Sequence, residues 1–249
     1  METPKLSTMV VLYNTNLLLD TTYLLEHLPL TTHLIRIEKR GVLLRGESSR
    51  DKIRRRSKKE EKKSNTGFGH NSITLVMLND GNGALPKKEI TVKIFQNGVF
   101  HLTGVLDERY DKDTMNKLLA ILQKSCQESY RDTVETAEIL SRRVVLMNYT
   151  TKLTTNDTVP REALHNSIRT AKLENVMSYY DPDVYPGVKI HVGTDNWTAK
   201  VFRTGKIILT GITCEDDCKS FMIQLLALFE QVLPKKQTLA YMSDKVALP

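Results

Sequence analysis

The sequence has few of the residues that mark disulfide-rich and membrane proteins. Of its 249 residues only three are cysteines, Cys126, Cys214 and Cys218, which are too few and odd in number for a disulfide framework. No apolar stretch approaches the ~18 residues that a membrane-spanning helix needs. The N-terminal residues lack the apolar core and small-residue cleavage site of an export signal. These absences favour an intracellular protein in a reducing compartment, without a membrane partner.

The signatures of common enzymes and metal sites are also missing. The sequence has six histidines, and none lies at metal-ligand spacing beside a cysteine or carboxylate. Cys214 and Cys218 are four positions apart, but a pair of cysteines without two further ligands more often serves packing. There is no glycine-rich phosphate loop, no Gly-x-Ser-x-Gly and no His-Glu-x-x-His. We therefore expect no enzyme, no metal and no cofactor.

Charge points to an acidic partner. Lysine and arginine total 36 against 29 aspartates and glutamates, a net charge of +7, which suits nucleic acid or an anionic membrane surface. Residues 50–63 supply much of the excess, with nine basic and three acidic side chains and too few apolar ones to fold alone. They form the centre of an expected flexible insert at about residues 47–67. This insert is either a nucleic-acid arm or nuclear localisation signal, or a solvated loop.

An internal duplication organises the chain. Residues 91–104 read TVKIFQNGVFHLTG and residues 198–211 read TAKVFRTGKIILTG, with seven of fourteen positions identical and no gap. Upstream, in the same order, VVLYN at 10–14 resembles VVLMN at 144–148. We therefore predict two repeats, residues 1–140 and 141–249, of which the first is longer because it carries the insert.

Both repeats show the same order of elements. An opening strand precedes a short helix, at residues 21–28 or 161–172. Further strands end in a hairpin that turns at Asn97-Gly98 or Thr204-Gly205. A longer amphipathic helix closes each repeat, with apolar residues at helical spacing: Met115, Leu118, Leu119 and Leu122, then Phe221, Leu225, Leu228 and Val232. This order predicts an α+β fold with helices on one face of an antiparallel sheet.

The face of the sheet that points away from the helices has an unusual composition. Because side chains alternate along a strand, the apolar positions of the two hairpins define a core face: Val92, Ile94, Phe100 and Leu102, then Ala199, Val201, Ile207 and Leu209. The opposite face carries Lys93, Phe95, His101 and Thr103 in the first repeat, Lys200, Phe202, Ile208 and Thr210 in the second, and Asn14 and Asn148 from the opening strands.

Such a mixture suits the minor groove of DNA. Asparagine and threonine donate to adenine N3 and thymine O2, phenylalanine wedges between base steps, and lysine meets phosphates. The alternative is a sheet face buried in a dimer or beneath a partner chain.

The second repeat also resembles a known family. Residues 178–192 (SYYDPDVYPGVKIHV) and 200–211 (KVFRTGKIILTG) are similar to the stirrup loop and neighbouring hairpin of TATA-binding proteins. The first repeat matches at its opening strand and at KIFQNGVFHLTG. With its basic insert, the whole chain resembles the diverged TATA-binding-like proteins of large DNA viruses.

The resemblance implies a fold and a function. The fold is a pseudo-twofold saddle of two repeats, a curved antiparallel sheet with helices on its convex face. The function is minor-groove binding and bending of double-stranded promoter DNA, which nucleates transcription initiation with a transcription factor IIB-like protein and a DNA-directed RNA polymerase. For a viral protein this places it in the host nucleus or a cytoplasmic viral factory. The alternative function is a scaffold that keeps the saddle but binds a partner protein on its concave face, without bending DNA.

The resemblance also assigns roles to residues. Asn14 and Asn148 match paired asparagines that contact bases near the pseudo-dyad, and Thr103 and Thr210 match the paired threonines there. Phe95 and Phe202 match wedge residues, and Tyr185 takes the place of the second wedge in its repeat; Phe68 is the nearest aromatic residue for the first. Asp181 and Asp183 match acids that contact transcription factor IIB. Lys93, Lys200 and Lys206 complete the expected DNA surface, although the family usually has apolar residues at the first two positions.

Overall fold

The computed structural model describes residues 1–39, 42–49, 51, 72–130, 136–153 and 158–233, and they form two compact units. We call Met9–Val145 the N-terminal unit, and Met1–Thr8 with Leu146–Pro249 the C-terminal unit. The predicted repeat boundary, between residues 140 and 141, differs from this division. The reason is that two long strands, β1 (Lys5–Thr15) and β7 (Ile139–Lys152), each supply residues to both units.

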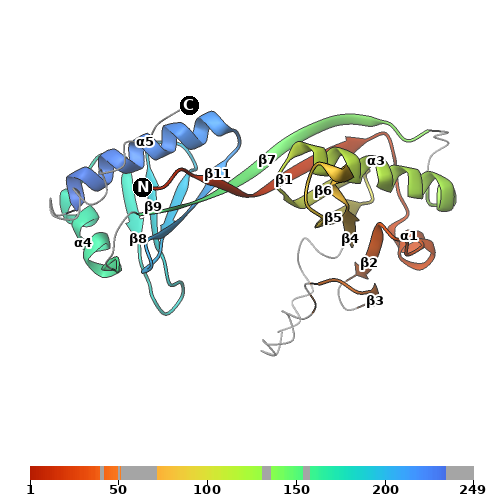
Figure 1. Cartoon of the computed structure of the whole chain (residues 1–249), viewed down its shortest axis with the longest axis horizontal. Helices are drawn as coiled ribbons and strands as arrows, with labels where there is room; N and C mark the ends of the chain where they lie inside the picture. Colours follow the sequence, from red (N-terminus) through yellow and green to blue (C-terminus); the bar gives the residue numbers. More distant parts are fainter. Residues whose placement is uncertain (40–41, 50, 52–71, 131–135, 154–157, 234–249) are drawn as a thin grey trace. The chain divides into compact units, whose positions relative to one another are not determined.

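In its described residues the N-terminal unit is an antiparallel sheet with α-helices on one face (Figure 1). Its elements after β1 are α1 (Thr21–His27), β2 (Leu34–Lys39), β3 (Leu43–Gly46), β4 (Ser72–Asn79), β5 (Lys88–Phe95), β6 (Val99–Val105) and α3 (Glu108–Ser125). The strands are ordered β3-β2-β4-β5-β6-β1. Helix α1 begins where the Asp20 carboxylate accepts hydrogen bonds from the backbone N–H groups of Thr22 and Tyr23, and Asp107 caps α3 in the same way.

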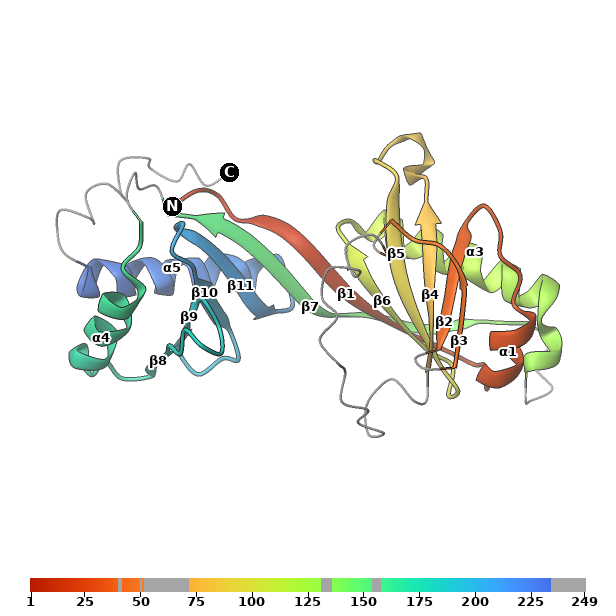
Figure 2. The ribbon, with the colours of Figure 1, turned by 90° about the horizontal axis from the view of Figure 1, so that it is seen from below.

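Helix α3 packs on strands β4, β5 and β6 (Figure 2). Its Met115, Leu118 and Leu122 are fully buried, as are the four predicted core residues of the hairpin, Val92, Ile94, Phe100 and Leu102. Burial of such side chains contributes roughly 1.5 to 3 kcal/mol each. The core face of this repeat is therefore the one predicted from the alternation.

A buried charged group also fixes α3 to the sheet. Asp111 is completely buried; it accepts hydrogen bonds from the Tyr13 hydroxyl at 2.7 Å and from Arg142 Nε at 2.7 Å. Burial and the neighbouring carboxylate raise the pKa of Tyr13, so its hydroxyl stays protonated and donates. Residues far apart in the chain are thereby joined within the N-terminal unit.

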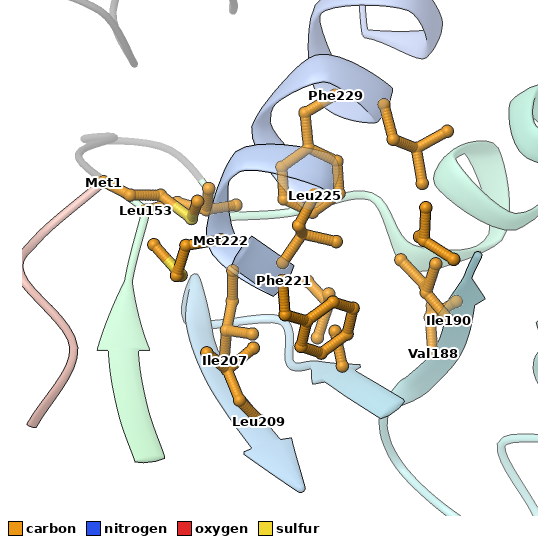
Figure 3. Close-up of a cluster of buried hydrophobic side chains, with 14 of the residues drawn as sticks. Met1, Leu153, Val188, Ile190, Ile207, Leu209, Phe221, Met222, Leu225 and Phe229 are labelled. Atoms are coloured by element: carbon orange, nitrogen blue, oxygen red, sulfur yellow. The ribbon is translucent and has the colours of Figure 1, made fainter. Parts of the chain in front are cut away.

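The C-terminal unit repeats this arrangement. Its elements after β7 are α4 (Arg161–Ala171), β8 (Val176–Tyr179), β9 (Val188–Val192), β10 (Thr198–Val201), β11 (Lys206–Ile212) and α5 (Glu215–Val232), with strands ordered β7-β11-β10-β9-β8. Figure 3 shows Phe221, Leu225 and Phe229 of α5 packed toward the strands that carry Val188, Ile190, Ile207 and Leu209. Ala199 and Val201 are fully buried as well, so the predicted core face is again confirmed.

The predicted fold class is confirmed: both units are α+β, with helices on one face of an antiparallel sheet. The hairpin turns contain Gly98 and Gly205 at φ 71° and 78°, a left-handed conformation that glycine adopts without strain. A Cβ on Gly98 would also lie 2.1 Å from the carbonyl oxygen of Leu17. None of the described helices is long and apolar enough to cross a membrane.

Candidate nucleic-acid interface

In each unit the side chains that alternate with the core residues lie on the other side of the sheet, which we call the non-core face. On the C-terminal non-core face, the strand pairing aligns one row across five strands: Tyr179, Lys189, Lys200, Ile208 and Thr150. The residues of β9, β10 and β11 next to this row are buried and belong to the core cluster on which α4 and α5 pack, so the row faces the other way, and Tyr179 is 51% exposed. This row forms the floor of a candidate binding surface.

An aromatic pair lies beside this row. The ring centroids of Tyr185 and Phe202 are 5.9 Å apart, and the planes are tilted by 60°, a favourable edge-to-face arrangement. Both side chains are half-buried. Gly187 makes room for them, because a Cβ there would lie 3.0 Å from Tyr185 Cε1 and 3.3 Å from Phe202 Cε1. The two wedge residues assigned to this repeat are therefore neighbours.

Two lysines lie near the tyrosine rings of this face. Lys189 Nζ lies 5.6 Å from the ring centroid of Tyr179 and 5.3 Å from that of Tyr185. Lys200 Nζ lies 5.9 Å from the Tyr185 centroid. These distances allow cation–π attraction. Sequence reasoning did not include Lys189 or Tyr179 in the site, although Lys189 alternates with the core residues Val188 and Ile190 and so belongs to the non-core face.

The remaining predicted residues of this unit lie on the same face. Thr210 pairs with Thr198, whose Oγ1 is 3.2 Å from His191 Nδ1. Lys206 is exposed and pairs with Lys152. Asn148 precedes Tyr149, the partner of Leu209, and its side-chain oxygen is shielded from solvent with no hydrogen-bond partner among the described residues.

The predicted partner-binding acids differ in their surroundings. The Asp181 carboxylate accepts hydrogen bonds from the backbone N–H groups of Asp183 and Val184, at 3.1 and 3.4 Å, and so shapes the turn. Asp183 is exposed, and its carboxylate makes no hydrogen bond to a described residue. The geometry thus leaves Asp183 the freer of the two for contact with another molecule.

The N-terminal non-core face carries a related but different set. Lys93 pairs with Thr74 and His101, and Phe95 pairs with Ser72. Burial, and then the charge of Lys93, lower the pKa of His101, so its imidazole is neutral at pH 7. Phe68, the aromatic residue considered for the second wedge, lies outside the described residues.

The strand pairing corrects one prediction about the repeats. The likeness of VVLYN to VVLMN makes Asn14 and Asn148 equivalent, and this is wrong. The equivalent hairpin residues Leu102 and Leu209 pair with Val11 and Tyr149, so Asn148 corresponds to Val10, and Asn14 corresponds to Lys152. The alignment of the two opening strands by sequence is therefore shifted by four residues from the alignment by strand pairing. An even shift keeps both asparagines on the non-core face, which is why alternation alone could not reveal it.

Asn14 and Thr103, which were expected to lie together near the pseudo-dyad, are therefore separated along β1. Asn14 pairs with Val99 and donates from Nδ2 to Ser141 Oγ at 2.7 Å, whereas Thr103 pairs with Val10. Thr103 and Thr210 remain equivalent, because the hairpins align without a gap.

The start of the predicted flexible insert is held in place. The Ser48 hydroxyl donates to Glu89 at 2.8 Å, and the Ser49 N–H donates to the same carboxylate at 2.9 Å. Asp51 forms an ion pair with Arg36, which is buried and also contacts Glu38 at 2.9 Å. Residues 47–49 and 51 therefore belong to the folded unit, while Arg50 and residues 52–67 lie outside the described residues.

Comparison with known proteins identifies the repeat that contains the aromatic pair. Residues 163–232 match the family model of "Transcription factor TFIID (or TATA-binding protein, TBP)". This part of the chain is similar to the TATA-binding proteins. This confirms the resemblance inferred from the sequence, and the family description names a transcription factor, in agreement with the prediction of a protein that is not an enzyme. The narrower resemblance to proteins of large DNA viruses stays a prediction.

Two archaeal relatives and one solved structure are similar to the chain. TATA-box-binding protein 3 of Methanosarcina acetivorans is 44% identical over 46 residues, 18% of this chain and 24% of the relative. TATA-box-binding protein 2 of the same organism is 40% identical over 47 residues, 19% and 24% respectively. The chain thus matches about a quarter of the length of these relatives. The structure of Methanococcus jannaschii TBP matches 93% of this chain and 100% of its own, with a TM-score of 0.53 and 17% identity, which shows a shared fold.

Proposed function

We propose that the chain has a TATA-binding-like role in transcription: it binds double-stranded DNA in the minor groove through its non-core faces and bends it. The observation that carries this proposal is the Tyr185–Phe202 pair, for which Gly187 leaves room, beside Lys189 and Lys200 of the non-core face. The pair lies within residues 163–232, the part of the chain that matches the family model.

The chemistry of the face supports minor-groove contact. An aromatic wedge unstacks a base step and kinks the duplex toward the major groove. Thr103 and Thr210 supply hydroxyl donors, and Asn148 supplies an amide, all suited to the adenine N3 and thymine O2 acceptors. The same donors meet the guanine amino group unfavourably, so the proposal includes a preference for A·T over G·C.

The proposed partners follow from the surface chemistry. Asp183 offers an exposed carboxylate in the turn after β8, and we assign it to contact with a basic surface of a transcription factor IIB-like protein, which recruits a DNA-directed RNA polymerase. Asp183→Lys should abolish capture of such a factor on a DNA-bound chain while leaving DNA affinity unchanged or higher.

Selection from a random duplex pool, followed by a bend-sensitive mobility assay on the selected sites, tests the proposal. We expect A·T enrichment at the central steps and a bent complex. Phe202→Ala and Phe95→Ala should each weaken binding by roughly 1 to 3 kcal/mol through lost stacking, and reduce the bend. Asn148→Ala should weaken the A·T preference more than Asn14→Ala. The reason is that Asn148 precedes Tyr149, the partner of Leu209 and so next to Thr210, whereas Asn14 pairs with Val99, far from Thr103.

The rival scaffold function predicts the opposite results. If the selected pool shows no A·T enrichment, the double variant at Phe95 and Phe202 binds and bends like the wild type, and a partner protein instead protects these side chains, the DNA-bending proposal is wrong.

A further inference from the structure

Two lysines of the C-terminal non-core face stand directly opposite each other. Lys189 of β9 and Lys200 of β10 are paired residues on adjacent antiparallel strands. Like charges at opposite positions destabilise a sheet. Both side chains are half-buried, and neither makes an ion pair with a described residue. The folded unit therefore holds two positive charges at paired positions, and no described carboxylate forms an ion pair with either.

The aromatic rings compensate only in part. Both ammonium groups lie within 6 Å of the Tyr185 ring centroid, at 5.3 and 5.9 Å, and Lys189 Nζ is also 5.6 Å from that of Tyr179. Neutral rings attract a cation more weakly than a carboxylate does, so the two positive charges are not neutralised. The N-terminal unit lacks this feature, because there the equivalent lysine, Lys93, pairs with Thr74. The doubled charge is thus a property of one repeat, not of the fold.

We propose that Lys189 and Lys200 form a phosphodiester-binding site beside the Tyr185–Phe202 pair, which grips the nucleic-acid backbone next to the step that the aromatic pair opens. An anion between the lysines removes their repulsion and gains two charge-assisted hydrogen bonds. The phosphate that links the nucleotides of a wedged step borders that step. The inference rests on the proposed DNA binding and adds a contact that positions the strand without reading sequence.

The salt dependence of binding tests this site. Lys189→Met with Lys200→Met keeps the length and apolar stem of both side chains and removes both charges. In titrations of a labelled duplex at several salt concentrations, we expect the slope of log affinity against log salt to fall by about one to two, because one or two fewer counterions are released. A single strand of the same sequence, titrated in parallel, shows whether a free backbone is bound by the same lysines.

A matched control carries the same change in net charge. Lys124→Met with Lys219→Met removes two exposed lysines from α3 and α5, the helices that cover the core faces. This control should keep the wild-type slope. A milder variant, Lys189→Thr, copies Thr74 of the N-terminal unit and should lower the slope by about one; it serves if the double variant does not fold.

The outcomes separate this inference from the proposed function. Equal salt slopes for the folded lysine variants, the control and the wild type would overturn the site, even if the wild type bends A·T-rich DNA. A reduced slope on a duplex that is not bent supports the site while contradicting the wedge. If the lysine variants lose binding to anionic lipid vesicles while their salt slope on the duplex is unchanged, the lysines belong to a membrane-binding surface, and the phosphodiester site is overturned as well.

Discussion

At the scale of single residues, Gly187 decides the geometry of the aromatic pair. Its missing Cβ leaves the space that the edges of Tyr185 and Phe202 occupy. Any larger residue would have to displace one ring or the other. The glycine thus acts on the binding face through its neighbours and not through a contact of its own.

Gly187→Ala should therefore weaken DNA bending while leaving the fold intact. The added Cβ would lie 3.0 Å from Tyr185 Cε1, which is tighter than most carbon–carbon contacts, so the ring must shift by a few tenths of an ångström. We expect a smaller bend angle and lower affinity in a bend-sensitive assay, with an unchanged circular dichroism spectrum. A bend equal to that of the wild type would mean that the placement of the rings does not matter.

His101 gives the N-terminal unit a dependence on pH. Its pKa in the folded state is lowered, by burial first and Lys93 second, below the value of ~6.5 that it has when unfolded. Below pH ~6.5 the unfolded chain protonates His101 more readily than the folded chain does. The free energy of unfolding is therefore unaffected by protonation of His101 above pH ~6.5 and decreases as the pH falls below it.

His101→Gln should remove this part of the acid sensitivity. The measurement is the free energy of unfolding by urea for both proteins between neutral and mildly acidic pH. The wild type should lose more stability than the variant over this range. If the free energy of unfolding falls equally with pH in both proteins, His101 is not the source of the acid sensitivity.

At the scale of elements, helix α3 is fixed to the sheet by a buried carboxylate as well as by apolar packing. Asp111 joins β1 through Tyr13 and β7 through Arg142. Apolar contacts do not define how far a helix slides along a sheet, whereas these hydrogen bonds have one geometry. The network therefore sets the position of α3 over the strands that present Lys93 and Phe95 on the other face.

Asp111→Asn should destabilise the N-terminal unit by roughly 2 to 3 kcal/mol, since hydrogen bonds to charged groups are lost and Arg142 keeps an unpaired charge. The midpoint of urea unfolding measures this. Glu108→Gln is a suitable control, because the ion pair of Glu108 with Lys112 is exposed and is worth less than ~1 kcal/mol. Equal midpoints for the two variants would contradict a stabilising role for the network.

At the scale of the whole molecule, charge is distributed unevenly along the chain. Residues 52–63 carry eight basic and two acidic side chains, while the segment just before them is acidic and tied to Arg36 and Glu89. The basic stretch thus begins at a point that the folded N-terminal unit fixes.

Replacing residues 52–63 by a neutral glycine-serine segment of equal length should lower the salt slope of DNA binding without changing sequence preference. Asp51 is kept in this variant, because its removal would leave the buried Arg36 with one fewer carboxylate. The measurement is the same titration series, with selection from a random pool as the second readout. An unchanged slope would favour a passive loop or a localisation signal.

The sequence by itself determined the duplication, the fold class and which side chains share a face. These follow from local rules: a gapless repeat of fourteen residues, glycine at the hairpin turns, and alternation with period two. For this reason Phe202, Lys200 and Thr210 could be assigned to the non-core face from the sequence alone, whereas Tyr185, which lies in the loop before β9, was assigned only through the family resemblance.

Only the tertiary structure decided the register and the neighbours. A shift of four residues between opening strands leaves every side chain on its face, so no pattern in the sequence distinguishes Asn14 from Val10 as the partner of Thr103. Lys189 became a site residue only when strand pairing placed it opposite Lys200, and Asp111 acquired its role only when α3 docked on β1. Which residues alternate is fixed by neighbours in the chain, whereas which residues meet is fixed by hydrogen bonding and packing between strands far apart in it.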